Sequence, residues 1–81
     1  MKKLIGKPVV VEWKDPEITA GWANKTTVES DMTLIKSYGV LVHVDKEKIS
    51  VAGTVAGDGH LCDVTKFPRG VIQNIKEVKK K

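Results

Sequence analysis

The stretch from Gly39 to Ala52 reads GVLVHVDKEKISVA and carries the clearest structural signal in the chain. β-branched residues crowd both of its arms, whereas only polar side chains occupy the four positions 45–48 between them. Such residues pack well on a pleated sheet, and a polar interruption between two such runs is typical of a turn. The stretch therefore predicts a β-hairpin, and the rest of the chain is expected to supply its neighbours.

Composition extends this expectation to the whole chain. Valine and isoleucine together number 18 among 81 residues, against four leucines and four alanines. Branching at Cβ costs rotamer freedom in a helix, so this balance favours strands. The length allows one small domain, over residues 1–81, in which a single core is barely sufficient and oligomerisation often adds the missing burial.

The sequence also indicates the cellular compartment. No apolar run is long enough to cross a bilayer, and residues 1–8 have a basic start without the apolar segment of a signal peptide. A single cysteine, Cys62, cannot form an intrachain disulfide, which fits a reducing compartment. We therefore expect a cytoplasmic protein with no membrane partner.

Basic residues gather at the ends of the chain. The formal net charge is +4, but six of the 14 bases lie at positions 2, 3, 76 and 79–81, which leaves the body nearly neutral. Basic ends attract polyanions over a range that salt shortens. We expect residues 79–81 to form a basic C-terminal tail.

Hydrophobic patterning predicts five strands. In the first strand Val9, Val11 and Trp13 should share one face, with Val10 and Glu12 on the other. Residues 16–32 follow no regular pattern and predict a long loop that holds a short edge strand or a functional surface. The five expected strands are residues 8–14, 33–44, 48–56, 60–66 and 71–78.

Glycines mark where this sheet should bend or reverse. Gly39 lies inside the second expected strand, which indicates a bend or bulge. Residues 57–59 (Gly-Asp-Gly) tolerate positive φ and predict a tight hairpin turn. Five strands are too few for a two-sheet sandwich and fit a strongly bent, partly open barrel.

Three short motifs resemble the Sm-like (LSm) family. Gly39, Leu41 and Asp45 are similar to the glycine, hydrophobic and aspartate positions of the family's first motif, and Arg69-Gly70 resembles its second motif. Residues 6–12 are also similar to the opening of the family's first strand. The resemblance covers residues 6–78 with gaps, and it implies a five-stranded SH3-like barrel that assembles into rings and binds RNA.

Unpaired edge strands give a physical reason for such rings. An open barrel leaves two strands with unsatisfied backbone groups, which head-to-tail pairing between identical subunits can satisfy. By analogy with the family, the turns at 45–48 and 68–70 would then face a central pore. That arrangement would repeat their positive charges in every subunit and attract phosphates.

The candidate binding residues are basic or aromatic. Ile49 stands where the family has an asparagine that holds a uracil base, so the resemblance implies low base selectivity. The ordinary alternatives are that the lysines only solubilise the hairpin, that Phe67 packs in the core and that Trp22 folds over it. The candidates for phosphate contact are Lys46, Lys48, Lys66 and Arg69, and those for stacking on bases are Trp22 and Phe67.

Catalysis and metal binding are not expected. Asp58, His60, Cys62 and Asp63 lie close together, but no second cluster of histidine or cysteine completes a tetrahedral metal site. A pairing of Cys62 with His43 or His60 lacks any recognisable oxyanion hole. We therefore expect no cofactor and no enzymatic activity.

Two functions follow from these patterns. The first is a ring-forming protein that binds RNA or single-stranded DNA electrostatically, with low base selectivity. The alternative is a structural or assembly module, for example of phage origin, in which the barrel edges and the 16–32 loop contact other proteins. In that case the lysines serve solubility alone.

Overall fold

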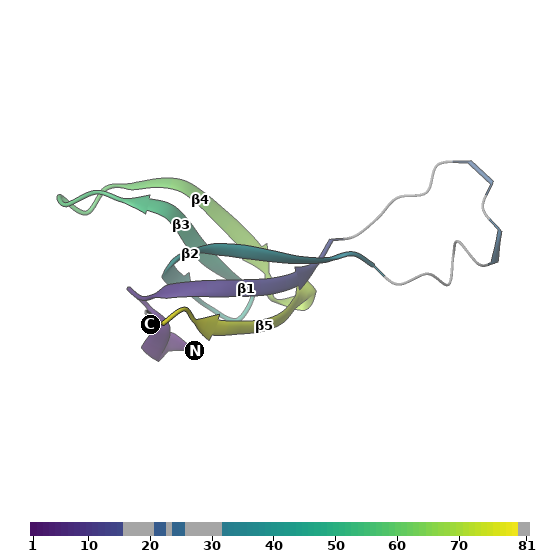
Figure 1. Ribbon diagram of the computed structural model, residues 1–81, viewed down its shortest axis with the longest axis horizontal. Coiled ribbons are helices and arrows are strands. Elements are labelled where there is room, and N and C mark those ends of the chain that lie inside the picture. Colours follow the sequence, from purple (N-terminus) through teal and green to yellow (C-terminus); the bar gives the residue numbers. More distant parts are fainter. Residues whose placement is uncertain (16–20, 23, 26–31, 80–81) are drawn as a thin grey trace.

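The computed structural model describes residues 1–15, 21–22, 24–25 and 32–79. Its strands form a single antiparallel sheet in the order β4-β3-β2-β1-β5 (Figure 1). The expectation of an all-β chain with five strands is thus confirmed. The elements are η1 (Lys2–Leu4), β1 (Pro8–Lys14), β2 (Leu34–Val44), β3 (Lys48–Val55), β4 (Leu61–Pro68), η2 (Arg69–Val71) and β5 (Ile72–Glu77), where η denotes a 3₁₀ helix.

The strand bounds agree closely with the prediction. β1 has the predicted ends, and the other strands differ by one or two residues. The largest difference is in β4, which continues to Pro68 because that residue lies opposite Lys48 in the β3–β4 ladder. The predicted loop at 16–32 and tail at 79–81 fall largely outside the described residues.

The main core cluster lies on one face of the sheet, although Val10 and Ala52 on the other face are also buried. Val9 and Val11 alternate inward from β1 and are fully buried, as the period-2 pattern predicts. Trp13 continues this face, and its indole N–H donates to Ser37 Oγ at 2.9 Å, so its polar atom is satisfied. The buried core cluster comprises Val9, Val11, Leu41, Ile49, Val51 and Phe67, and the half-buried Leu4, Trp13, Val44, Ile72 and Ile75 pack against it.

Strand β2 departs from regular geometry at two points. A Cβ atom added to Gly39 would lie 2.5 Å from Val51 Cγ1 and 2.7 Å from the Ala52 carbonyl oxygen, so only glycine fits this close approach of β2 to β3. Further along, the register between the strands shifts by one residue between Leu41 and His43. The irregularity that we predicted at Gly39 therefore lies between Leu41 and His43, and it places Val44 back on the core face.

The sheet has two free edges. Within the described residues no ladder joins β4 to β5, so these strands are the edges and the sheet is neither closed nor strongly curled. The inner face nevertheless bends enough for Trp13 of β1 to meet Phe67 of β4, with ring centroids 5.4 Å apart in an edge-to-face contact. The structure therefore confirms the five antiparallel strands of the predicted barrel, but not its strong bend.

Candidate nucleic-acid interface

The turn between β2 and β3 is organised by one carboxylate. Asp45 Oδ1 accepts hydrogen bonds from the backbone N–H groups of Glu47 and Lys48, at 2.8 and 2.9 Å. Its other oxygen lies 2.8 Å from Lys48 Nζ and 2.9 Å from His43 Nε2. Because the Asp45 side chain accepts hydrogen bonds from the backbone that follows it, it stabilises the turn at residues 45–48.

These contacts keep the turn charged. The Lys48 ammonium, followed by His43 and the two backbone N–H groups, lowers the pKa of Asp45 well below its usual range. Asp45 in turn raises the pKa of Lys48, through a hydrogen bond and its charge. Lys48 therefore already forms an ion pair with Asp45. It is a weaker candidate for phosphate contact than its place in the sequence suggests.

Arg69 joins the end of β4 to this turn. Its backbone N–H donates to the Glu47 carbonyl at 2.8 Å, and its Nη1 donates to the Asp45 carbonyl at 2.8 Å. The two basic turns, which lie 24 residues apart in the sequence, are thus adjacent in the structure. Such convergence is what a shared phosphate-binding surface requires.

A shallow hollow of about 300 Å³ lies at this junction, lined by Lys2, Val44, Asp45, Lys46 and Arg69. Lys2 comes from η1 and was not among the predicted site residues. Its role depends on how η1 sits against the sheet, where the Gly6 N–H donates to the Leu41 carbonyl at 2.7 Å. Three cations therefore surround one carboxylate that Lys48 already pairs, and the hollow is positively charged.

The remaining predicted residues lie elsewhere. Lys66 is exposed on the outer face of β4, opposite Ser50. Phe67 is only 3% exposed and contacts Trp13, so it packs in the core and has no free face for a base. Trp22 is fully exposed, which is the state that a stacking platform or a partner anchor needs.

The candidate metal-binding side chains and the candidate nucleophile named from the sequence lie around the β3–β4 turn and at the start of β4. In the part of the chain that the structure describes, no group of three or more histidine, cysteine or acidic residues could hold a metal ion. In the β3–β4 turn, the backbone N–H of His60 donates to Asp58 Oδ1, and the His60 ring nitrogen Nδ1 lies 2.9 Å from the same oxygen. Cys62 is exposed on an edge strand. Among the same residues, no helix has the length and apolar character needed to span a membrane.

Comparison of the chain with protein-family models, with curated proteins and with solved structures finds no match.

Proposed function

We propose that this protein is a ring-forming nucleic-acid-binding protein of the Sm-like kind, which binds RNA or single-stranded DNA with low base selectivity. The observation that carries the proposal is the junction where Lys2, Lys46 and Arg69 line one hollow beside the β2–β3 turn. Lysine and arginine side chains contact phosphates, and these contacts supply affinity without reading sequence.

The geometry of the sheet supports the barrel component of this proposal. In a flat sheet β1 and β4, separated by two strands, would lie roughly 14 Å apart. The contact between the Trp13 and Phe67 rings requires the inner face to bend between them. We infer a partly open barrel whose remaining gap, between β4 and β5, is filled by neighbouring subunits.

Pairing of the free edges would concentrate the charge. The edge of β4 in one subunit can pair with the edge of β5 in the next, and repetition of this heterologous contact closes into a ring if the rotation allows. Each subunit would then contribute its own hollow to a common surface. A body that is nearly neutral overall would carry a ring of cations at one level.

Low base selectivity follows from what the turn offers to a ligand. Ile49, at the position where the family has its base-binding asparagine, is fully buried and cannot reach a base. Lys46 and Arg69, with Lys2, would contact phosphates, while Lys48 and the more distant Lys66 would add weaker attraction. Trp22 is the one predicted aromatic residue with an exposed ring, and stacking on it would tolerate any base.

Fluorescence anisotropy with a short labelled single strand tests this proposal. We expect binding that weakens steeply with salt, with a log–log slope of about −0.7 per phosphate contacted. Lys46→Ala combined with Arg69→Ala should weaken binding and flatten the slope. Lys36→Ala, which removes an exposed lysine from β2, should change both much less. Salt-independent binding, or equal losses in the two variants, would contradict the proposal.

The alternative function is an assembly module. It is favoured by the fully exposed Trp22 and by Tyr38, which is 66% exposed on the outer face of the sheet, because exposed aromatic residues often anchor protein partners. On this alternative the same anisotropy experiment gives no binding at low salt, although the chain still assembles.

A further inference from the structure

The outer face of the sheet, opposite the main core cluster, carries a continuous apolar patch. Val10 of β1 pairs with Tyr38 of β2, and Val40, two residues further along β2, pairs with Ala52 of β3. Ala52 in turn pairs with Val64 of β4. Strand alternation places these five side chains on the face away from the core cluster. The patch therefore crosses four neighbouring strands.

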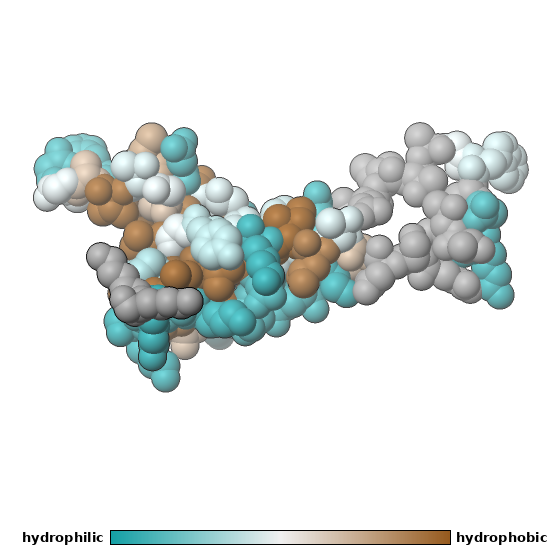
Figure 2. Space-filling model, in the orientation of Figure 1, coloured by the Kyte–Doolittle hydropathy of each residue, from teal (hydrophilic) through white to brown (hydrophobic). Residues whose placement is uncertain are grey.

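Part of this patch is open to solvent. Val10 and Ala52 are buried, but Tyr38 is 66% exposed and Val64 is 42% exposed. Leu34, on the same face of β2, is 49% exposed. Figure 2 shows hydrophobic side chains interleaved with hydrophilic ones over the body of the sheet. Exposed apolar patches with a polar rim are typical of interaction sites.

Lysines form the rim of the patch. The cross-strand register places Lys14, Lys36, Lys66 and Lys76 on the outer face. Among the strand residues that the structure describes, Glu12 is the one acidic residue on this face. Four lysines against one glutamate leave the face positively charged, which favours an acidic partner.

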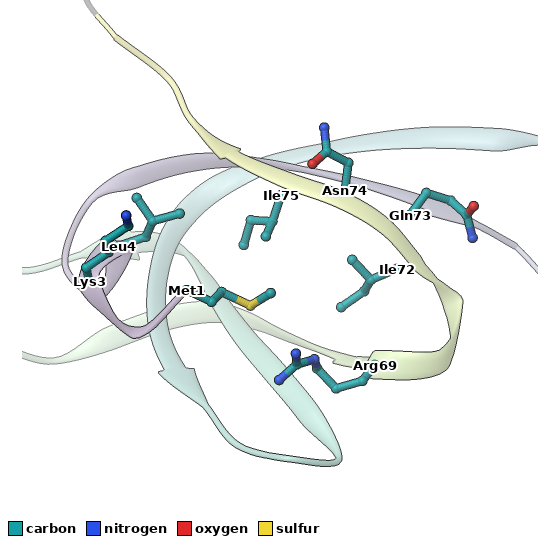
Figure 3. Close-up of a pocket in the computed structure, with 8 residues that line it drawn as sticks. All are labelled: Met1, Lys3, Leu4, Arg69, Ile72, Gln73, Asn74 and Ile75. Carbon is teal, nitrogen blue, oxygen red and sulfur yellow. The ribbon is translucent and has the colours of Figure 1, made fainter.

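Glu12 is already paired within the subunit. Lys76 Nζ lies 3.5 Å from Glu12 Oε1, and Asn74 Nδ2 donates a hydrogen bond to the same atom at 3.3 Å. Asn74 can do so because it projects from β5 away from Ile72 and Ile75 (Figure 3). The Glu12 side chain is only 17% exposed, so a partner on this face meets mainly positive charge.

The form of the partner follows from what a sheet face offers. Backbone N–H and C=O groups point along the sheet toward neighbouring strands, so the face presents side chains alone. An extended peptide lying on it would lose hydrogen bonds to water without gaining backbone partners. A helix satisfies its own backbone groups and can bury an apolar stripe against a sheet. Leu34 to Val40 span roughly 20 Å along β2, the length of a helix of about 14 residues.

We propose that the outer face of the sheet binds an acidic amphipathic helix of another protein. The apolar stripe of that helix covers Leu34, Tyr38 and Val40 along β2, and its acidic flanks meet Lys36 and Lys66. The outer face of a second copy cannot take this place, since lysines would oppose lysines. The patch has one aromatic ring and is otherwise aliphatic, which favours a protein over the bases of a nucleic acid. The inference requires neither the ring nor nucleic-acid binding.

A stapled helical peptide of about 14 residues, with leucines on one face and glutamates on both flanks, tests this proposal. Titrated into isotope-labelled protein, it should bind saturably and shift the NMR amide signals of residues 34–40 rather than those of the turn at 45–48. The same peptide with lysine in place of every glutamate should bind about tenfold more weakly. Absence of saturable binding by the glutamate peptide, or equal affinity of the two peptides, would overturn the inference.

Charge reversal tests the lysine rim. Lys36→Glu combined with Lys66→Glu should reverse the preference, so that the lysine peptide binds about tenfold more tightly than the glutamate peptide. Circular dichroism verifies that the double variant folds. A folded double variant that still prefers the glutamate peptide would contradict the inference.

Two valines of similar exposure test which face is used. Val64→Ser, on the outer face, should weaken binding of the glutamate peptide about threefold. Val55→Ser is the matched control, because Val55 is 46% exposed on the core face of β3, and it should leave the affinity unchanged. Tyr38→Ala should weaken binding about tenfold. Equal effects of the two valine substitutions, or no effect of Tyr38→Ala, would contradict the inference.

This interface and the proposed nucleic-acid interface can fail separately. Lys46→Ala combined with Arg69→Ala should leave the affinity for the glutamate peptide unchanged, and an excess of the labelled single strand should not displace the peptide. If the single strand displaces it, nucleic acid occupies the outer face and the inference is wrong. If the peptide binds as expected but no salt-dependent nucleic-acid binding is found, only the proposed function fails.

Discussion

The β2–β3 and β3–β4 hairpins share strand β3, yet they differ in what surrounds them. The first carries Leu41 and Ile49, which are fully buried, and its turn receives Arg69 from the end of β4. The second leaves Val55 and Leu61 partly exposed, and among the described residues the hydrogen bonds of its turn join only residues 56–60.

The two turns have similar hydrogen bonds but different surroundings. In both, an aspartate accepts hydrogen bonds from following backbone N–H groups and pairs with a histidine. Asp45 also binds Lys48 and has a side chain 34% exposed, whereas the Asp58 side chain is 67% exposed. The turn at Asp45 thus differs from the turn at Asp58 because a distant residue, Arg69, donates a hydrogen bond to its backbone and brings a further positive charge beside it.

The largest expected effect comes from making the same truncation in each hairpin. Leu41→Ala removes a fully buried side chain and should lower the free energy of unfolding by about 2–5 kcal/mol. Leu61→Ala should change that of the dissociated subunit by no more than about 0.5 kcal/mol. Chemical denaturation at low protein concentration measures both. Similar losses would mean that Leu61 is packed as well as Leu41, which would contradict the exposure of Leu61.

Glycine substitutions in the two hairpins should also differ in their effect on stability, by a smaller amount. Gly39→Ala places a Cβ atom against Val51 and the Ala52 carbonyl, and overpacking of this kind costs about 1–3 kcal/mol. Gly57→Ala, in the β3–β4 turn, meets no atom within 4 Å and should be close to neutral. Thermal denaturation of the two variants provides the measurement. A neutral Gly39→Ala would contradict the close approach of β2 to β3.

Substitutions of the two turn aspartates should differ in their effect on Tm, by a still smaller amount. Asp45→Asn keeps the size of the side chain but loses the ion pair with Lys48, so we expect a lower Tm. Asp58→Asn alters a more exposed turn, in which the hydrogen bonds of the described residues join only positions 56–60, and it should leave Tm nearly unchanged. Differential scanning calorimetry at low salt compares them, and equal shifts would remove the distinction between a docked and a free turn.

Low pH should abolish the contribution of Asp45 to stability. Since the pKa of Asp45 is lowered in the folded protein, the stability it contributes is fully present above its unfolded pKa of about 3.9 and is lost as the pH falls through the lower folded value. The Tm difference between wild type and Asp45→Asn should therefore stay constant from neutral pH to about pH 5 and shrink below about pH 4. A difference that grows toward low pH would contradict the assigned hydrogen bonds.

Local patterns predicted the strands because their signals lie in neighbouring residues. The alternation of Val9, Val11 and Trp13 gave the core face of β1, and the polar run 45–48 gave the β2–β3 turn. Phe67 was left with two alternatives because the strand was expected to end at Lys66. Once β4 continues to Pro68, alternation places Phe67 on the core face.

Other features depended on distant contacts. The docking of Arg69 on Asp45 joins residues 24 positions apart, and the position of Lys2 depends on how η1 sits against β2. The degree of curvature of the sheet follows from twist and bulges summed over five strands, which a hydrophobic pattern does not encode. The candidate site was therefore predictable as a set of basic turns, but not as one hollow with Lys2 in its wall.

We propose that the subunits pool their basic turns to bind one strand of nucleic acid. Native mass spectrometry of the protein mixed with a short single-stranded oligonucleotide tests it most directly. We predict a closed oligomer of uniform size that carries one oligonucleotide, and loss of the oligonucleotide, with the oligomer intact, for Lys46→Ala combined with Arg69→Ala. Free monomers, or one oligonucleotide bound to each subunit, would contradict the account.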